Sequence, residues 1–260
     1  MNGLNVLLQK EFREAWRSRK FLWIPLVFAL IGMSEPLTNF YMMDILEAVG
    51  NMPEGFEMLM PELVPADLLL ATISQFQLIG LLVLMASFVG SISKERSSGL
   101  ATLLYVRPIS FGAFFISKFL VISTVGFVSI VAGFTASVYY TVVLYGKFEI
   151  GTLLASVSTY FIWLLFVIAL TLMMSAMFNT VVATTCAFIV IFVGQILDGL
   201  VGTFWTISPW KLPSYGVQLI RGTMEMPHYW WSLAITIVLI VICISIGVFS
   251  MNKNAAMTKI

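Results

Sequence analysis

Charged side chains are scarce in this sequence: they make up 10% of its 260 residues, whereas hydrophobic residues make up 60%. The mean hydropathy is +0.98. A water-soluble fold with this composition would expose large apolar patches, so soluble fold classes are excluded. A transmembrane helix needs about 20 apolar residues to cross a hydrocarbon core about 30 Å thick, and several runs are that long. The sequence therefore predicts an all-α integral membrane protein.

Cysteine and histidine are also nearly absent, since the chain has only Cys186, Cys243 and His228. Both cysteines lie in apolar runs, which favours buried apolar residues over a disulfide or a metal pair. His228 precedes a Tyr-Trp-Trp sequence typical of a membrane interface, so an interfacial residue is favoured over a ligand or a base. There is no GxxxxGK[ST] phosphate loop, no HExxH and no GxSxG motif. We therefore expect no catalytic site, no metal site and no cofactor in this chain.

The apolar runs predict six transmembrane helices within a single domain, 1–260. Residues 4–20 place Leu4, Leu8 and Phe12 on one helical stripe beside basic residues, which predicts an amphipathic helix at the membrane interface. That helix is either a flank that sets the topology or a docking platform for a partner. The predicted parts are the interfacial helix 1–20, spans one and two in 21–93 with an acidic external loop 43–67, a cytoplasmic loop 94–117, spans three to six in 118–251 with an external re-entrant segment 206–228, and a tail 252–260.

The basic residues predict which side of the membrane each loop occupies. With both termini inside, five lie in the N-terminal segment, four in the loop between spans two and three, and two in the tail, against three outside. Basic residues are enriched in cytoplasmic loops. Both termini are therefore expected in the cytoplasm.

Acidic residues within the spans are limited to Glu35 and Asp198, both toward the outer side. A carboxylate at such a depth either lines a polar path or reaches the interface, and both readings stay open. The candidate polar residues of a translocation path are Glu35, Gln75, Gln77, Gln195 and Asp198. An ion-coupled carrier usually places ionisable groups near the midplane, so this chain has no evident internal source of energy.

One polar stretch, residues 93–118, interrupts the apolar pattern. Its marked residues are Lys94, Glu95, Arg96, Gly99, Leu103, Leu104, Arg107, Pro108 and Lys118. In this order the stretch resembles the permease subunits of ABC-2 type transporters, where a charged exit, a glycine, a leucine pair, a proline and a lysine follow one another. The resemblance covers nearly the whole chain, including the long first external loop, the tight turn at 178–180 and the broken segment before the sixth span.

The resemblance implies an ABC-2 (type V exporter-like) permease fold, with a coupling helix in residues 94–117 that sits in a cleft of an ATP-binding subunit. Leu100 with the leucine pair would give this helix an apolar face at i, i+3 and i+4, and its arginines could pair with acidic groups. The alternative is an ordinary solvated loop helix. The predicted contact residues are Lys94, Glu95, Arg96, Gly99, Leu100, Leu103, Leu104, Arg107 and Pro108.

The resemblance also implies the partners and the location. The protein is similar to small Bacillus-type permeases encoded beside a separate ATP-binding subunit. Such a permease pairs with two ATP-binding subunits, which bind ATP and Mg²⁺, and with a second permease chain, identical or related. Membrane lipids are expected partners, and nucleic acid is not. The location implied is a bacterial plasma membrane.

The function expected is therefore a transmembrane permease subunit that exports an amphipathic or hydrophobic substrate and hydrolyses no ATP itself. The alternative from another class is a membrane sensor or assembly factor that binds a cytoplasmic partner without moving a solute. A third hypothesis, an intramembrane enzyme, would depend on Glu35 or His228 and would need no ATPase.

Overall fold

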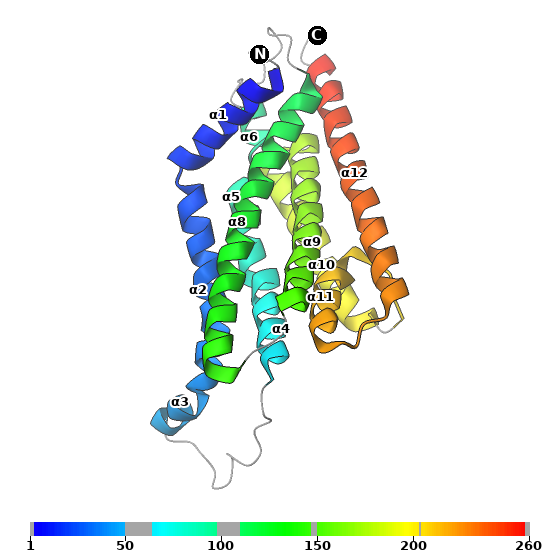
Figure 1. Ribbon diagram of the computed structural model, residues 1–260. Helices are drawn as coiled ribbons and strands as arrows, with labels where there is room; N and C mark the ends of the chain where they lie inside the picture. The colour runs from blue at the N-terminus through cyan, green and yellow to red at the C-terminus, as the bar shows by residue number, and fades with distance from the viewer. Residues whose placement is uncertain (1–2, 50–63, 98–109, 147–149, 203, 258–260) are drawn as a thin grey trace.

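The computed structural model describes residues 3–49, 64–97, 110–146, 150–202 and 204–257, and every regular element in these ranges is helical (Figure 1). The elements are α1 (Gly3–Arg17), α2 (Lys20–Phe40), α3 (Met42–Val49), α4 (Pro65–Gln75), the π-helix η2 (Phe76–Gly80), α5 (Leu81–Phe88), α6 (Ser93–Ser97), α8 (Phe111–Tyr145), α9 (Ile150–Met177), α10 (Thr180–Val201), the 3₁₀-helix η3 (Pro209–Lys211), α11 (Leu212–Arg221) and α12 (Met226–Met257).

Six helical segments in the described ranges are long and apolar enough to cross a membrane, which confirms the predicted six-span, all-α membrane protein. They are Lys20–Phe40, Pro65–Ser97, Phe111–Tyr145, Gly151–Met177, Thr180–Val201 and Met226–Lys253. The long helices stand side by side, and α1 slants across the end at which α12 finishes (Figure 1). This end is called the α1 end below. The short helices α3 and α11 lie toward the opposite end.

The interface between α2 and α8 is the most extensive helix contact among the described elements. Ser129, Gly133 and Ser137 are all buried on α8, which confirms that their four-residue spacing forms a packing face. An added Cβ on Gly32 of α2 would lie 2.1 Å from the carbonyl oxygen of Gly133. The two backbones therefore meet without side chains between them.

Changing Gly133 to alanine is expected to lower the free energy of unfolding by about 1–3 kcal/mol, because overpacking forces the neighbours apart. The new Cβ would lie 2.5 Å from the ring of Phe76 and 2.9 Å from the backbone oxygen of Phe28. Gly112, on the same helix, has no neighbour within 4 Å of such a Cβ. Gly112→Ala should leave stability unchanged or raise it by up to about 1 kcal/mol. Unfolding of both variants in detergent micelles tests this contrast, and equal losses would contradict it.

The second span is not a uniform α-helix, because the π-helical turn η2 interrupts it between α4 and α5. Phe76, at the start of this turn, is fully buried, and its ring centroid lies 5.2 Å from that of Phe28 and 5.4 Å from that of Phe134. Aromatic packing of this kind stabilises the π-turn, whose backbone hydrogen bonds depart from the regular α-helical pattern.

The helix α1 is joined to α2 by a turn in which Arg19 has a left-handed backbone, with φ 56° and ψ 18°. A non-glycine residue rarely adopts this conformation, and here it bends the chain from the slanting α1 into α2 (Figure 1). On α1, the buried stripe is Leu7, Glu11 and Ala15, whereas Phe12 and Trp16 are 40% and 65% exposed. The predicted amphipathic helix is confirmed, but the stripe that packs on the protein includes a glutamate.

Short connections join the helices in the second half of the chain. Only Phe178 and Asn179 separate α9 from α10, and the Asn179 side chain accepts a hydrogen bond from the Val182 amide, which caps α10. This confirms the predicted tight hairpin. The broken segment before the sixth span contains η3 and α11, and Arg221 at the end of α11 pairs with Asp67 at the start of α4.

Candidate functional site

The exit of the second span is where the described residues carry the richest set of polar contacts. Of the predicted coupling residues, Lys94, Glu95 and Arg96 lie in α6. The others lie outside the described residues: Gly99, Leu100, Leu103, Leu104, Arg107 and Pro108. The three consecutive charged side chains of α6 point to three different places.

Glu95 joins a cluster of four charged residues that connects α6 to α1 and α8. The ammonium of Lys118, on α8, donates to both carboxylate oxygens of Glu11 at 2.9 Å and to Oε1 of Glu95 at 2.9 Å. Lys10 donates to the same Glu95 oxygen at 2.7 Å and to Glu11 at 3.0 Å. Two ammonium groups thus face two carboxylates. We call Lys10, Glu11, Glu95 and Lys118 the exit cluster.

Lys118 is the most deeply buried member of the exit cluster, with a side chain only 2% exposed, and that of Glu11 is 9% exposed. A buried ammonium is costly unless its charge is paired and its donors are satisfied. Here all three donors of Lys118 have an acceptor, and its Nζ also lies 5.0 Å from the centre of the Phe114 ring. The cluster is therefore charge-balanced and fully hydrogen-bonded at its centre.

Lys10 completes the cluster on the solvent side. Burial alone would lower the pKa of its ammonium, but the hydrogen bond to Glu95 and the attraction of Glu11 and Glu95 outweigh burial and raise that pKa above its usual value. Lys10 therefore stays charged throughout the physiological range. The charge of Lys10, the second positive charge of the cluster, therefore does not change with pH in this range.

The exit cluster is an ion-pair network rather than a metal site. Glu11, Glu14 and Glu95 place carboxylate oxygens within 4.8 Å of one another. However, the ammonium groups of Lys10 and Lys118 already lie within hydrogen-bond distance of Glu11 and Glu95. A cation at the same oxygens would have to displace the lysines and meet their repulsion.

Arg96 connects α6 to the turn between α9 and α10. Its guanidinium donates to the carbonyl oxygen of Ala176 at 2.8 Å and to that of Phe178. The last carbonyls of a helix have no partner within the helix, and a cation there also favours the helix dipole. Arg96 therefore caps the end of α9.

Hydroxyl groups reinforce this attachment. The Ser93 hydroxyl lies 2.9 Å from that of Thr180, the first residue of α10, and the Ser175 hydroxyl accepts a hydrogen bond from the Ser93 amide at 3.1 Å. Ser93 and Ser175 are both buried. The short helix α6 is thus attached on one side to α1 and α8, and on the other to the α9–α10 turn.

Lys94, by contrast, is exposed and lines a cavity of about 440 Å³. The cavity lies among the ends of α1, α2, α5, α6 and α10, and its lining mixes charged groups, Glu14, Lys20, Lys94 and Glu95, with hydroxyls and apolar groups. These include Ser87, Ser91, Thr184, Val89 and Phe188.

The candidate path residues fall into two groups. Gln75 of α4 donates to Glu35 of α2 at 2.9 Å, and Asn39 donates to the same carboxylate at 3.3 Å. Asp198 of α10 lies 3.7 Å from the ammonium of Lys211. No hydrogen bond or ion pair joins these two groups in the described ranges. Gln77 is half-buried in the π-turn η2.

Gln195 and Asp198 retain unused polar atoms. In the part of the chain that the structure describes, Nε2 of Gln195 and Oδ1 of Asp198 are buried without a hydrogen-bond partner. Buried polar atoms normally find one, so these two atoms are exceptions in the described residues. Their place in a path stays a prediction.

The sequence alone did not single out Glu11, whose two carboxylate oxygens both accept hydrogen bonds from the buried Lys118. The signal was present, because Glu11 lies four residues after Leu7 and four before Ala15, and both of these are buried. A carboxylate on a buried helical stripe needs a cation opposite it. Lys118 was marked only as part of the family pattern, at the entrance of a span, whereas α8 begins seven residues earlier, at Phe111.

Comparisons with known proteins agree with this architecture. The sequence profile of the family described as ABC-2 family transporter protein matches residues 5–212. The chain is also 32% identical over 181 residues to the protein of Bacillus subtilis (strain 168) described as uncharacterized transmembrane protein YxlG, and the match covers 70% of each chain. The chain therefore belongs to the ABC-2 transporter family, a membership that supports the role of a transport permease.

Proposed function

We propose that this chain is the permease subunit of an exporter whose ATP is hydrolysed by a separate subunit, which contacts residues 94–108. The observation that carries the proposal is the double attachment of α6, through Glu95 to α1 and α8 and through Arg96 to the α9–α10 turn. The rest of the predicted coupling segment, which lies outside the described residues, follows α6 directly in the sequence. A displacement of that segment would be transmitted to α6 first.

The need for an external source of energy is supported by the positions of the charged residues. In the described parts of the spans, acidic and basic side chains lie toward helix ends: Lys20, Glu35, Asp67, Lys94, Glu95, Arg96, Lys118, Asp198 and Lys253. Carriers driven by an ion gradient place such groups near the midplane. Energy would instead arrive mechanically, through a cytoplasmic contact at the α1 end.

The exit cluster and the Arg96 contacts would convert one displacement into movement of two helix groups. Charge-assisted hydrogen bonds are stronger and shorter than neutral ones, so α6 would carry its partners rather than slide past them. Closure of two ATP-binding subunits beneath two permease chains would then tilt the spans and open a path between the halves.

The cavity beside Lys94 supports an amphipathic cargo. Its hydroxyl groups and its charged side chains, which include Lys20 and Lys94, suit a polar headgroup, while Val89 and Phe188 suit an apolar tail. A volume of about 440 Å³ lies in the range of small-molecule sites. The cavity is at the end proposed to face the cytoplasm, where export would begin.

Co-reconstitution of this chain with its cognate ATPase in liposomes tests the proposal. We expect ATP-dependent movement of a lipid-like fluorescent cargo that requires both subunits, and we expect its loss when Leu103 and Leu104 are both changed to aspartate. Two buried charges cannot be accommodated in an apolar groove, so the loss should exceed ten-fold, roughly 1.4 kcal/mol.

The matched control is Lys253→Gln, which removes an exposed charge at the same end of the bundle outside the segment and should leave transport within about two-fold, as is usual for surface substitutions. Full transport by the double aspartate variant would contradict the coupling role. Binding of the ATPase without any ATP-dependent movement of cargo would instead support the sensor or assembly factor.

A further inference from the structure

The cavity beside Lys94 lies at the level where three spans end. Its lining includes Lys20, the first residue of the first span, Thr180, the first residue of the fifth span, and Lys94, near the last residue of the second. The hydrocarbon core of a membrane ends where its spans end, and the lipid headgroups lie at that level. The volume of about 440 Å³ suits a headgroup rather than a whole lipid.

Two ammonium groups on this lining have donors to spare. Lys20 donates to the backbone oxygen of Ser87 at 3.0 Å, and its Nζ lies 4.4 Å from the centre of the Phe88 ring. The stem of Lys94 lies against Gly90, where an added Cβ would be 2.8 Å from the lysine Cε. The Lys94 ammonium has no hydrogen bond or ion pair within the described residues. Each ammonium has three donors, so most of them are available to an anion.

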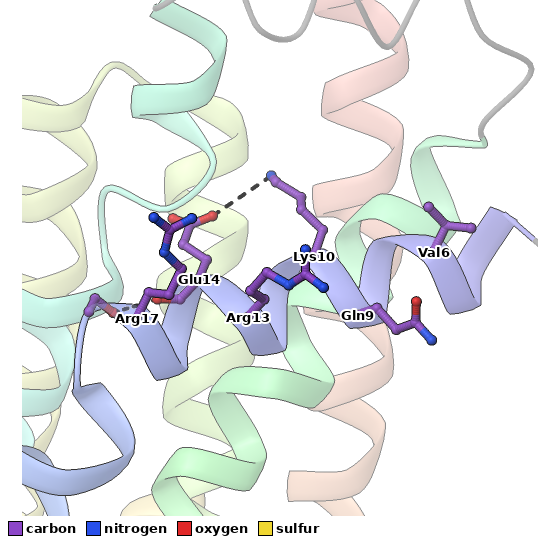
Figure 2. Close-up of a pocket in the computed structure, with 7 residues that line it drawn as sticks. Val6, Gln9, Lys10, Arg13, Glu14 and Arg17 are labelled. Carbon is purple, nitrogen blue, oxygen red and sulfur yellow. Dashed lines mark hydrogen bonds and ion pairs between the residues drawn. The ribbon is translucent and has the colours of Figure 1, made fainter.

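A carboxylate with unused acceptors belongs to the same lining. In the described ranges the Glu14 carboxylate accepts no hydrogen bond, and its one ion pair is with Lys10 at 3.9 Å, the contact drawn in Figure 2. Glu95, the other acid of the lining, is already bonded within the exit cluster. No ion pair joins Glu14 to Lys20 or Lys94 in the parts of the chain that the structure describes. The cavity therefore offers charges of both signs that do not neutralise each other.

We propose that this cavity selects a zwitterionic amphiphile, whose phosphate is bound by Lys20 and Lys94 and whose primary ammonium is bound by Glu14. Because it names the headgroup of the cargo, this proposal rests on the proposed function. A purely anionic headgroup would bring a like charge to Glu14, and a cationic one would face two ammonium groups. A quaternary ammonium has no N–H and cannot donate the charge-assisted hydrogen bond that Glu14 can accept.

The apolar part of the amphiphile has a place beside the same cavity. Val89 and Phe188 belong to the lining. Val181 and Ile189, on α10, are 77% and 54% exposed, and each follows a lining residue by one position. Successive residues differ by about 100° around a helix, so this exposed apolar stripe borders the lining. An amphiphile covers the polar cavity and the apolar stripe at once, whereas a free headgroup or a polar peptide would leave the stripe uncovered.

The test measures which lipid stays bound to the full chain without an ATPase. The protein is purified in detergent containing equal amounts of phosphatidylethanolamine, phosphatidylglycerol and phosphatidylcholine with the same acyl chains, and the retained lipids are counted by mass spectrometry. We expect the wild type to retain phosphatidylethanolamine preferentially. Glu14→Gln should reduce its preference over phosphatidylglycerol by on the order of ten-fold, the usual effect of losing a charged hydrogen bond. Lys94→Gln should lower the retention of phosphatidylethanolamine roughly five-fold.

The matched control, Lys253→Gln, removes an exposed charge at the same end of the bundle and should keep the wild-type preference. An excess of glycerophosphoethanolamine, the headgroup without acyl chains, should displace no lipid. The proposal is overturned if the wild type retains all three lipids alike, if Glu14→Gln keeps the full preference, or if the control loses it too. Displacement by the free headgroup would also overturn it, because the ligand would then not be an amphiphile.

Two further outcomes separate this proposal from its alternatives. If Glu14→Gln/Lys94→Gln loses binding of the ATPase in lipid-free detergent but retains lipids as the wild type does, the cavity binds a protein and the proposal is overturned. If the wild type prefers phosphatidylethanolamine but moves none of it in liposomes with its ATPase, the binding site is supported and only the transport role is contradicted.

Discussion

Replacing Lys118 with methionine is expected to lower the free energy of unfolding by about 3–5 kcal/mol, the usual cost of removing one partner from a buried ion pair. Methionine keeps the length and volume of the stem but removes the ammonium. Glu11 would lose the cation that binds both of its oxygens, and Glu95 would keep only Lys10 among the cations of the exit cluster. The loss is measured by unfolding in detergent micelles.

A second variant separates lost charge pairing from lost packing. In Glu11→Gln/Lys118→Met the uncompensated carboxylate is gone, so the double variant should lose less stability than the sum of the two single variants. Lys94→Met serves as the exposed control, and it should change stability by less than about 0.5 kcal/mol. A loss below about 1 kcal/mol for Lys118→Met, or strict additivity, would show that the exit cluster does not hold α1 against α8.

Changing Arg96 to glutamine is expected to uncouple transport from ATP hydrolysis. Glutamine cannot span both carbonyl groups at the end of α9, so the attachment of α6 to the α9–α10 turn would rest on Ser93 and Ser175. Hydrogen bonds to charged groups contribute about 1.5–3 kcal/mol, and coupling energies between sites are of the same size. Cargo moved per ATP hydrolysed should therefore fall by on the order of ten-fold, while binding of the ATPase is retained.

Lys253→Gln is the control for this measurement, because Lys253 is exposed at the same end of the bundle and takes part in neither attachment. Its ratio of transport to hydrolysis should match the wild type. An Arg96→Gln protein with an unchanged ratio would mean that the α9–α10 turn does not receive the movement.

The elements that depend on composition and spacing could be predicted from the sequence. Six spans follow from the lengths of the apolar runs, and the buried face of α8 follows from Ser129, Gly133 and Ser137 at four-residue intervals. The tight turn between α9 and α10 follows from the shortness of its polar interruption. These features are local, so neighbouring residues are enough to specify them.

Other features depend on partners that are distant in the sequence. Glu11 and Lys118 are 107 residues apart, and only the packing of α1 across α8 brings them together. The π-turn at Phe76 is stabilised by rings from α2 and α8 rather than by its own sequence. Arg19 occupies a left-handed turn that sequence patterns assign to glycine or asparagine. None of these could be read from the residues nearby.

The predicted site, too, could be read from the sequence only in part. The charged exit Lys94-Glu95-Arg96 was identified from its resemblance to the family, but its side chains were expected to face an ATPase. The structure places Glu95 and Arg96 in contacts within the chain. A contact of the remaining coupling residues with an ATP-binding subunit stays a prediction, as does the alignment of Glu35 and Asp198 along a path.

The most direct test of the account asks whether the link between α6 and the α9–α10 turn transmits the movement. Ser93 and Thr180, whose hydroxyls are 2.9 Å apart, are both changed to cysteine in the Arg96→Gln protein, with Cys186 and Cys243 replaced by alanine. Transport per ATP is measured in proteoliposomes before and after oxidation. If the attachment itself carries the movement, the disulfide restores the ratio to near the wild-type value, and reduction removes it again. Failure of a fully formed disulfide to restore transport would contradict the account.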